Sequence, residues 1–232
     1  MYLLTSAPYL IIGLGLILGK AGLRPALLSW GVCILGGLSG LAVTIAILGM
    51  GQPWVLAVLS FLPFIIVLIM VIKDVSYPLL NDVATDLDTP TAFTAALHAP
   101  VNASRDMTYP ESFKLKVRNR YPNVRPLILD EPADQAFDRV INLVKSRPNW
   151  RITHQDPAAK IIEAEAVTSF LGFVDDVVIQ VSPQQGASRV DMRSKSREGA
   201  VDAGKNAKRI EKFLKQLRQA GGVQSSDHSA GR

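Results

Sequence analysis

Hydrophobic and polar positions divide the chain into two parts with different periodicities. Residues 1–73 form long apolar stretches whose charged side chains are Lys20, Arg24 and Lys73 alone. From about residue 121 onward, stretches of period two alternate with stretches of helical period. An apolar surface all round a helix is typical of a lipid environment, whereas periods of 2 and about 3.6 residues indicate half-buried strands and helices. The sequence therefore predicts a membrane region followed by a water-exposed domain.

Three uncharged stretches in the first part are long enough to cross a bilayer. They are Met1–Gly19, Pro25–Met50 and Pro53–Ile72. As helices they would extend roughly 28, 39 and 30 Å, against a hydrocarbon core of about 30 Å. We expect a transmembrane region over residues 1–73, with helices at about 2–19, 26–50 and 53–72. No Lys or Arg precedes the first stretch, which argues against a cleaved signal peptide.

The few cations of this region predict its orientation. Lys20 and Arg24 lie between the first two stretches, Lys73 follows the third, and the connection Gly51–Gln52 has no charge. The positive-inside rule then places everything after Ile72 in the cytoplasm. We expect a multi-pass protein of the inner membrane, in a bacterial envelope, with a cytoplasmic C-terminal domain.

The second stretch carries two glycines, Gly36 and Gly40, at a spacing that permits close helix approach. Packing within the three-helix group is the favoured interpretation. Dimerisation through this face is the alternative.

Residues 74–111 contain four prolines and little periodicity, which predicts an extended connector. Three carboxylates, Asp82, Asp86 and Asp88, lie close together within it. Oxygen ligands at such spacing suit Ca²⁺ or Mg²⁺. Asx-turns and helix caps explain the same residues and are favoured.

Residues 112–220 show the order strand, helix, strands, helix, which predicts an α+β fold with helices on one face of an antiparallel sheet. The expected strands are 124–129, 150–154, 160–169, 174–181 and 188–197; the helices end at Pro148 and near Ala220. Residues 221–232 are expected to be a flexible tail.

The last expected strand places charged side chains on one face at period two: Arg189, Asp191, Arg193, Lys195 and Arg197. A solvated face with weak ion pairs is one interpretation, and an anion-binding surface is the other. The interleaving of acids and bases favours the first.

The final helix has an apolar stripe and a basic remainder, comprising Lys205, Lys208, Arg209, Lys212, Lys215 and Arg218. Beside anionic headgroups each cation would gain about 1 kcal/mol, so this helix is a candidate membrane-surface element. A solvated back of a docked helix is an equally good interpretation.

Composition adds little evidence for catalysis. The chain has 232 residues, a net charge of +5, one Cys and three His, and those histidines are scattered. Phosphate loops and nucleophile elbows are absent from the sequence, as are the aromatic platforms and zinc spacing of nucleic-acid binders. We therefore expect no enzyme activity, cofactor, metal or nucleic-acid partner.

Several spaced motifs follow one another along the chain: Tyr77–Asp86, Tyr121–Pro122, Trp150, Ile162–Ala164, Gly172–Ile179, Ser188–Ser194, Gly204–Ala207 and Arg209–Ile210. In this order they resemble the family called domain of unknown function 1499 (DUF1499). The resemblance runs from about Tyr77 to Leu217 and implies a small α+β domain without established chemistry, which in bacteria often follows hydrophobic spans. The binding positions that it implies are Asn81, Asp82, Thr85, Asp86, Asp176, Arg189, Asp191, Arg193, Ser194 and Arg197.

Three functional hypotheses follow. The leading one is a non-enzymatic accessory module that binds anionic lipid headgroups or another membrane protein at the bilayer surface. The second is a metal-dependent hydrolase that uses Asp82, Asp86 and Asp88. The third is a structural subunit of a membrane complex, with Gly36 and Gly40 at the contact.

Overall fold

A computed structural model describes residues 1–22, 25–169 and 171–220. Arg24 and the expected flexible tail, residues 221–232, lie outside the described residues. The chain separates into two compact units. One contains residues 1–81 with the loops 167–174 and 196–204, and the other contains residues 82–166, 175–195 and the chain from Lys205. Each is described by itself.

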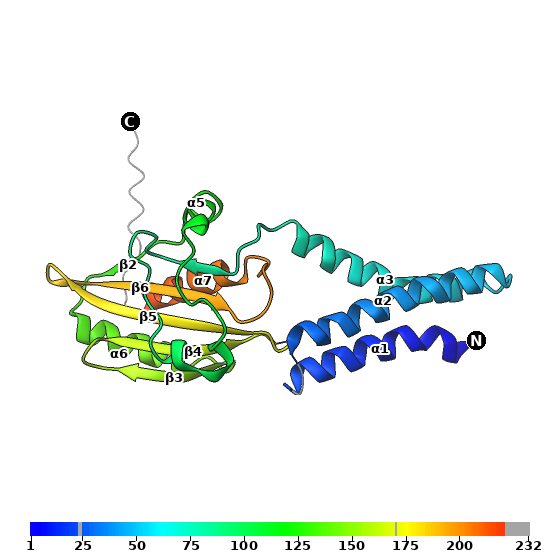
Figure 1. Cartoon of the computed structure of the whole chain (residues 1–232), viewed down its shortest axis with the longest axis horizontal. Helices are drawn as coiled ribbons and strands as arrows, with labels where there is room; N and C mark the ends of the chain where they lie inside the picture. Colours follow the sequence, from blue (N-terminus) through cyan, green and yellow to red (C-terminus); the bar gives the residue numbers. More distant parts are fainter. Residues whose placement is uncertain (23–24, 170, 221–232) are drawn as a thin grey trace. The chain divides into compact units, whose positions relative to one another are not determined.

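Three long helices dominate the first unit: α1 (Tyr2–Lys20), α2 (Ala26–Gly49) and α3 (Trp54–Val75) (Figure 1). All three are long and apolar enough to cross a membrane, as the sequence predicts. Large apolar side chains such as Leu3 and Trp54 are exposed along them. An apolar surface of this extent is unfavourable in water and suits lipid.

Glycines of α2 allow the three helices to approach closely. A Cβ atom at Gly36 would lie 2.6 Å from the Ile12 side chain of α1, and one at Gly40 would lie 2.6 Å from the carbonyl oxygen of Ser60 in α3. The glycine spacing therefore serves packing within the group. The face that the structural-subunit hypothesis assigns to a partner is occupied by the chain's own helices.

The second unit is built on a six-stranded antiparallel sheet with the order β1-β6-β5-β4-β3, in which β2 also pairs with β6. The strands are β1 (Asp82–Ala84), β2 (Leu127–Leu129), β3 (Trp150–Asp156), β4 (Ile161–Val167), β5 (Val174–Gln184) and β6 (Ala187–Ser196). Both β1 and β2 pair with β6, at Lys195 to Arg193 and at Val190 to Ser188 respectively. Gln185 and Gly186, with φ of 50° and 83°, make the two-residue turn between β5 and β6, which suits the right-handed strand twist.

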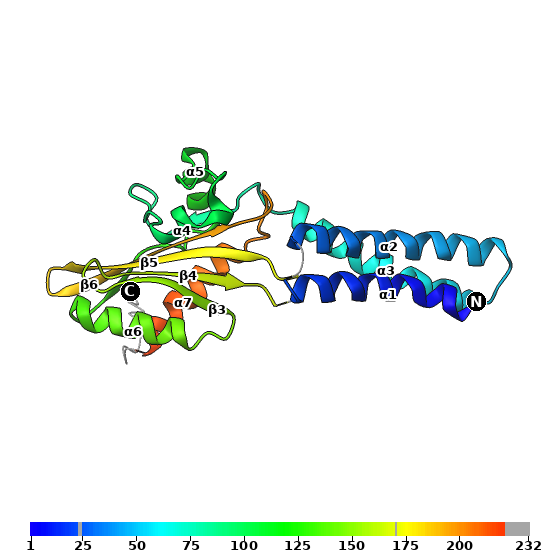
Figure 2. The same ribbon diagram turned by 60° about the horizontal axis from the view of Figure 1, so that its bottom comes forward.

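Helices α6 (Ala133–Lys145) and α7 (Lys205–Ala220) cover one face of this sheet (Figure 2). Their apolar stripes are buried, and the rings of Trp150 in β3 and Phe213 in α7 stack at 5.5 Å. The predicted α+β class, with an antiparallel sheet and helices, is confirmed.

Residues 82–111 differ from the extended connector that the sequence predicts. They contain β1, the short helix α4 (Ala95–His98) and the 3-10 turn η1 (Pro100–Asn102), and they lead into α5 (Glu111–Arg120). Phe93, Ala96 and Met107 form a second core with Val178 of β5. This segment therefore covers the second face of the sheet (Figure 2). Its elements are too short to show a hydrophobic period, which explains the different expectation.

Candidate functional site

The charged face of β6 is largely buried under residues 85–110. Arg193 is 2% exposed and Lys195 is 6% exposed. Arg193 donates from Nε to Asp82 Oδ1 at 2.9 Å and from Nη2 to Asp82 Oδ2 at 2.7 Å, while Lys195 Nζ donates to Oδ2 at 3.0 Å. The favoured expectation of a solvated face is therefore wrong for this half of the strand. The expectation failed because the alternating pattern of the strand does not show that residues 85–110 cover this face.

Aromatic rings complete the surroundings of Arg193. Its guanidinium lies 4.8 Å from the ring centre of Phe93 and 5.3 Å from that of Tyr109. Burial, followed by the charge of Asp82, raises the pKa of Tyr109 well above its ordinary value. The phenol is therefore neutral at physiological pH, and its ring lies against the guanidinium of Arg193.

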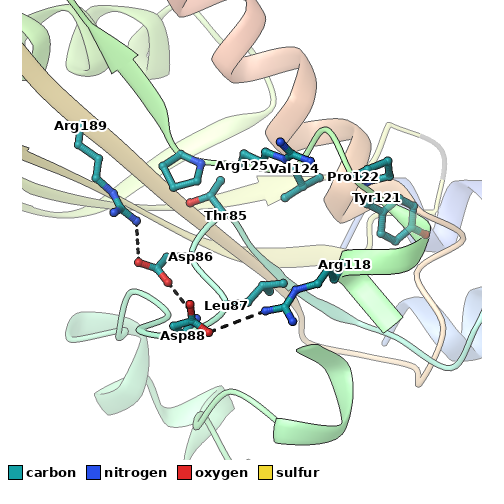
Figure 3. Close-up of a pocket in the computed structure, with 11 residues that line it drawn as sticks. Thr85, Asp86, Leu87, Asp88, Arg118, Tyr121, Pro122, Val124, Arg125 and Arg189 are labelled. Carbon is teal, nitrogen blue, oxygen red and sulfur yellow. Dashed lines mark hydrogen bonds and ion pairs between the residues drawn. The ribbon is translucent and has the colours of Figure 1, made fainter. Parts of the chain in front are cut away.

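Thr85, Asp86 and Arg189 lie together in a second, more accessible cluster (Figure 3), and Asp191 is hydrogen-bonded to Thr85 and Arg189. Arg189 donates from Nε to Asp191 Oδ2 at 2.7 Å and from Nη2 to Asp86 Oδ2 at 2.6 Å. Thr85 donates its hydroxyl proton to Asp191 Oδ1 at 3.0 Å. The sequence motif around Thr85 and the last strand are thus brought together, and four of the positions that the resemblance implies are in contact there.

Asp86 is fixed as an anion by its turn. Burial acts to raise the pKa of Asp86, but hydrogen bonds from Thr89 and Asp88 and the charge of Arg189 outweigh it, so the pKa lies below its ordinary value. Oδ1 accepts from the backbone amides of Asp88 and Thr89 at 2.9 Å each, which is the predicted Asx-turn.

A cavity of about 410 Å³ opens beside this cluster. Figure 3 shows the chain of contacts Arg189, Asp86, Asp88 and Arg118 along one side of it. Arg118, at the end of α5, lies 3.8 Å from Asp88 in an exposed pair. Arg125 also lines the cavity. We call these lining residues the arginine pocket; they comprise Thr85, Asp86, Leu87, Asp88, Arg118, Tyr121, Pro122, Val124, Arg125, Pro126 and Arg189.

The other positions implied by the resemblance lie elsewhere. Asp176, on the covered face, accepts from Asn102 at 3.1 Å and lies 3.6 Å from Arg105. Ser194, on the helix face, donates to Asn206 at 2.7 Å and accepts from Arg209 at 2.8 Å.

Two further implied positions belong to the first unit. The side-chain amide of Asn81 donates to the carbonyl oxygen of Gly199 at 2.7 Å. The backbone amide of Arg197 donates to the carbonyl oxygen of Val174 at 3.0 Å. The implied positions therefore do not form one site.

Five of the six cations that the sequence places on α7 are exposed: Lys205, Lys208, Lys212, Lys215 and Arg218. Arg209 is not, because it bonds Asp175 and Asn206 at the edge of the buried stripe. This is a correction to the predicted set.

Sequence reasoning missed two features. Glu163 is 1% exposed and accepts hydrogen bonds from the backbone amides of Ala95 at 3.0 Å and Ala96 at 2.7 Å, so it holds α4 on the sheet. The sequence pattern places Glu163 on the acid-bearing side of an alternating strand, but it does not predict that α4 packs over this residue. Arg118 and Arg125 carry no motif, and only the fold brings them to the arginine pocket.

The three carboxylates of the hydrolase hypothesis do not converge. Both oxygens of Asp82 are bonded to Arg193 and Lys195, whereas Asp86 and Asp88 line the arginine pocket. Within residues 1–22, 25–169 and 171–220, no three His, Cys, Asp or Glu side chains gather as a metal-ligand group.

A family model described as "Protein of unknown function (DUF1499)" matches residues 82–217. The chain belongs to the DUF1499 family. The match begins at β1, so the DUF1499 domain includes the cover of the second sheet face as well as the strands and helices that the sequence predicts. A comparison with curated proteins gave no match.

Solved structures share limited similarity with the chain. The di-domain ARO/CYC BexL from the BE-7585A biosynthetic pathway is 17% identical, with a TM-score of 0.32, over 41% of this chain and 44% of that chain. DR_A0006 from Deinococcus radiodurans is 9% identical, with a TM-score of 0.28, over 40% of this chain and 92% of that one. Zhui aromatase/cyclase from Streptomcyes sp. R1128 is 9% identical, with a TM-score of 0.26, over 43% and 84%. The chain thus spans less than half of the first of these proteins.

Proposed function

We propose that this chain is an integral, multi-pass membrane protein whose DUF1499 domain is a non-enzymatic accessory module that binds anionic lipid headgroups at the bilayer surface. The observation that carries the proposal is the row of exposed cations on α7. Lys205, Lys208, Lys212 and Lys215 follow one another at spacings of three and four residues, so they share one side of the helix.

The row is well separated from the core. Ala207, Ile210, Leu214 and Leu217 are buried on the opposite side of α7, and Glu211 is the one acidic residue of this helix. Lys212 and Lys215 have no hydrogen bond or ion pair within the described part of the chain. An exposed row of cations with two unpaired lysines favours an anionic partner.

Lipid is favoured over other anionic partners because α1, α2 and α3 are membrane-spanning candidates. A membrane anchor keeps the domain at high local concentration beside headgroups, where each Lys or Arg near the surface contributes about 1 kcal/mol. Lys20 and Lys73 flank the helices and, by the positive-inside rule, support a cytoplasmic domain on an inner membrane.

The non-enzymatic part of the proposal is supported by how the buried acids are used. Asp82, Asp175 and Asp176 are each occupied by an arginine, Arg193, Arg209 and Arg105 respectively. The first pair joins β1 to β6 and the other two join β5 to its covers, which leaves no free carboxylate among these three.

The test uses the full chain in nanodiscs, labelled with a nitroxide at Gln219→Cys in a Cys33→Ser background. Gln219 is exposed and continues the row without being one of its cations. We expect accessibility to a water-soluble relaxant to fall at least twofold in discs containing phosphatidylglycerol, relative to pure phosphatidylcholine. High salt should reverse the change, because it screens exposed charges.

Lys212→Gln/Lys215→Gln should abolish this difference. Lys116→Gln/Arg120→Gln is the matched control, since it removes two exposed cations from α5 and leaves α7 intact. Equal accessibility in both kinds of disc, or equal effects of the two double variants, would overturn the proposal.

A further inference from the structure

We propose that the arginine pocket binds the phosphate group of an organic phosphate. The site is separate from the α7 row, so this inference does not rest on the proposed function. It rests on a comparison between the hydrogen-bond donors and acceptors that line the cavity.

The carboxylate oxygens beside the cavity already accept hydrogen bonds from groups of the protein. Asp86 accepts four hydrogen bonds, from the amides of Asp88 and Thr89, the hydroxyl of Thr89 and Nη2 of Arg189. An ionised carboxylate offers about four acceptor sites, so this one has none to spare. Asp191, behind Arg189, accepts from Thr85 once and from Arg189 twice.

The donors, in contrast, are in excess. Arg125 has no hydrogen bond or ion pair within residues 1–22, 25–169 and 171–220. Arg118 has only the 3.8 Å pair with Asp88, in which both side chains are more than half exposed. Nη1 of Arg189 makes no hydrogen bond in the described part of the chain, because its two carboxylate partners are held by Nε and Nη2.

Three guanidinium groups therefore present unused N–H groups to one cavity from three elements: the end of α5, the segment before β2, and β6. A ligand that satisfies them must be rich in acceptors and negatively charged. A planar carboxylate can pair with one guanidinium group at a time. A phosphate group offers three or more oxygens in different directions and matches several.

The cavity is large enough to hold an organic group together with a phosphate. About 410 Å³ lies within the range of roughly 300–1,000 Å³ typical of small-molecule sites. Leu87, Val124 and Pro126 supply apolar wall on which the organic part of the ligand can rest. Asp88, exposed at the rim, is the carboxylate that the phosphate would displace from Arg118.

The experiment is isothermal titration of the full chain in maltoside micelles, which contain no phosphate. Glycerol 3-phosphate represents a soluble monoester, and glycerophosphoglycerol represents the diester of a lipid headgroup. Tighter binding of the first assigns the pocket to soluble phosphates, and tighter binding of the second assigns it to lipid headgroups; either result supports a phosphate site. Glycerol alone should give no heat.

Arg125→Gln and Arg118→Gln should each weaken binding of the preferred ester about tenfold, the scale expected for a lost charge-assisted hydrogen bond. Both residues are exposed, so the melting temperature should be unchanged. Arg151→Gln is the matched control, because Arg151 is an exposed arginine paired with Glu165 on β4.

Four results would overturn the inference: no binding of either ester, unchanged affinity in both pocket variants, equal loss in Arg151→Gln, or succinate binding as tightly as the esters. Inorganic phosphate binding as tightly as the esters would overturn the assignment to an organic ligand.

Discussion

Asp82 shows how a single buried carboxylate joins three segments of the DUF1499 domain. It lies on β1, is fully buried, and bonds both Arg193 and Lys195 of β6. Arg193 in turn donates to the carbonyl oxygen of Met107 in the cover at 2.9 Å. One anion between two cations is costly to remove, because the cations would stay buried without it.

Asp82→Asn should therefore lower the free energy of unfolding by about 3–5 kcal/mol, the range for breaking a buried pair. Chemical denaturation of the full chain in detergent micelles measures this change. Asp88→Asn, at an exposed carboxylate, is the control and should leave the midpoint almost unchanged. Equal midpoints for wild type and Asp82→Asn would contradict the account.

Asp86 predicts a pH dependence. Its pKa in the folded protein lies below the ordinary value of about 3.9, so its charged form stabilises the fold above that pH. The contribution is lost as pH falls through the folded pKa. The stability difference between wild type and Asp86→Asn should therefore be constant between about pH 5 and 7 and shrink below about pH 4. Urea denaturation across this range measures it, and a difference that grows on acidification would show the opposite linkage.

For single residues, the sequence correctly predicts which side chains share a face of a strand, but it does not predict whether that face is buried. The alternation in β6 places Arg189, Asp191, Arg193 and Lys195 together, and Asp175 and Asp176 do bond partners on opposite faces. Whether such a face is solvated depends on residues about a hundred positions earlier. Arg125 shows the same limit, since nothing local to it indicates a pocket.

Among the elements, α2 depends on glycine for its packing. Gly36 contacts α1 closely, whereas Gly31, on the same helix, has open space around it. Helix propensity changes equally when either residue is replaced, so the pair separates packing from propensity.

Gly36→Val should destabilise the three-helix unit by about 1–3 kcal/mol through overpacking, while Gly31→Val should be neutral or slightly stabilising. Thermal denaturation of the full chain in detergent compares the two. The same loss in both variants would mean that close packing is not the role of Gly36.

Elements with a clear hydrophobic period were predictable, whereas β1 and α4 were not. The three apolar helices and the helical stripes of α6 and α7 follow from periodicity over ten or more residues. The strand β1 has three residues and α4 has four, so neither displays a period. They form because Phe93 and Met107 bury against Val178 and because Glu163 holds α4, which are contacts between distant residues.

For the whole molecule, the distribution of cations predicts that the DUF1499 domain faces the cytoplasm. A C-terminal green fluorescent protein fusion should therefore fluoresce, and a C-terminal alkaline phosphatase fusion should be inactive. The reverse pair of results would place the domain on the other side, where the anionic cytoplasmic leaflet is out of reach.

The central claim is that α1, α2 and α3 hold this chain in a bilayer, where its DUF1499 domain acts. Alkaline carbonate extraction of cell membranes tests it most directly, with a peripheral membrane protein as the internal control. We predict that the full chain stays in the membrane pellet while the control protein is released. Recovery of the intact chain in the supernatant would contradict the account.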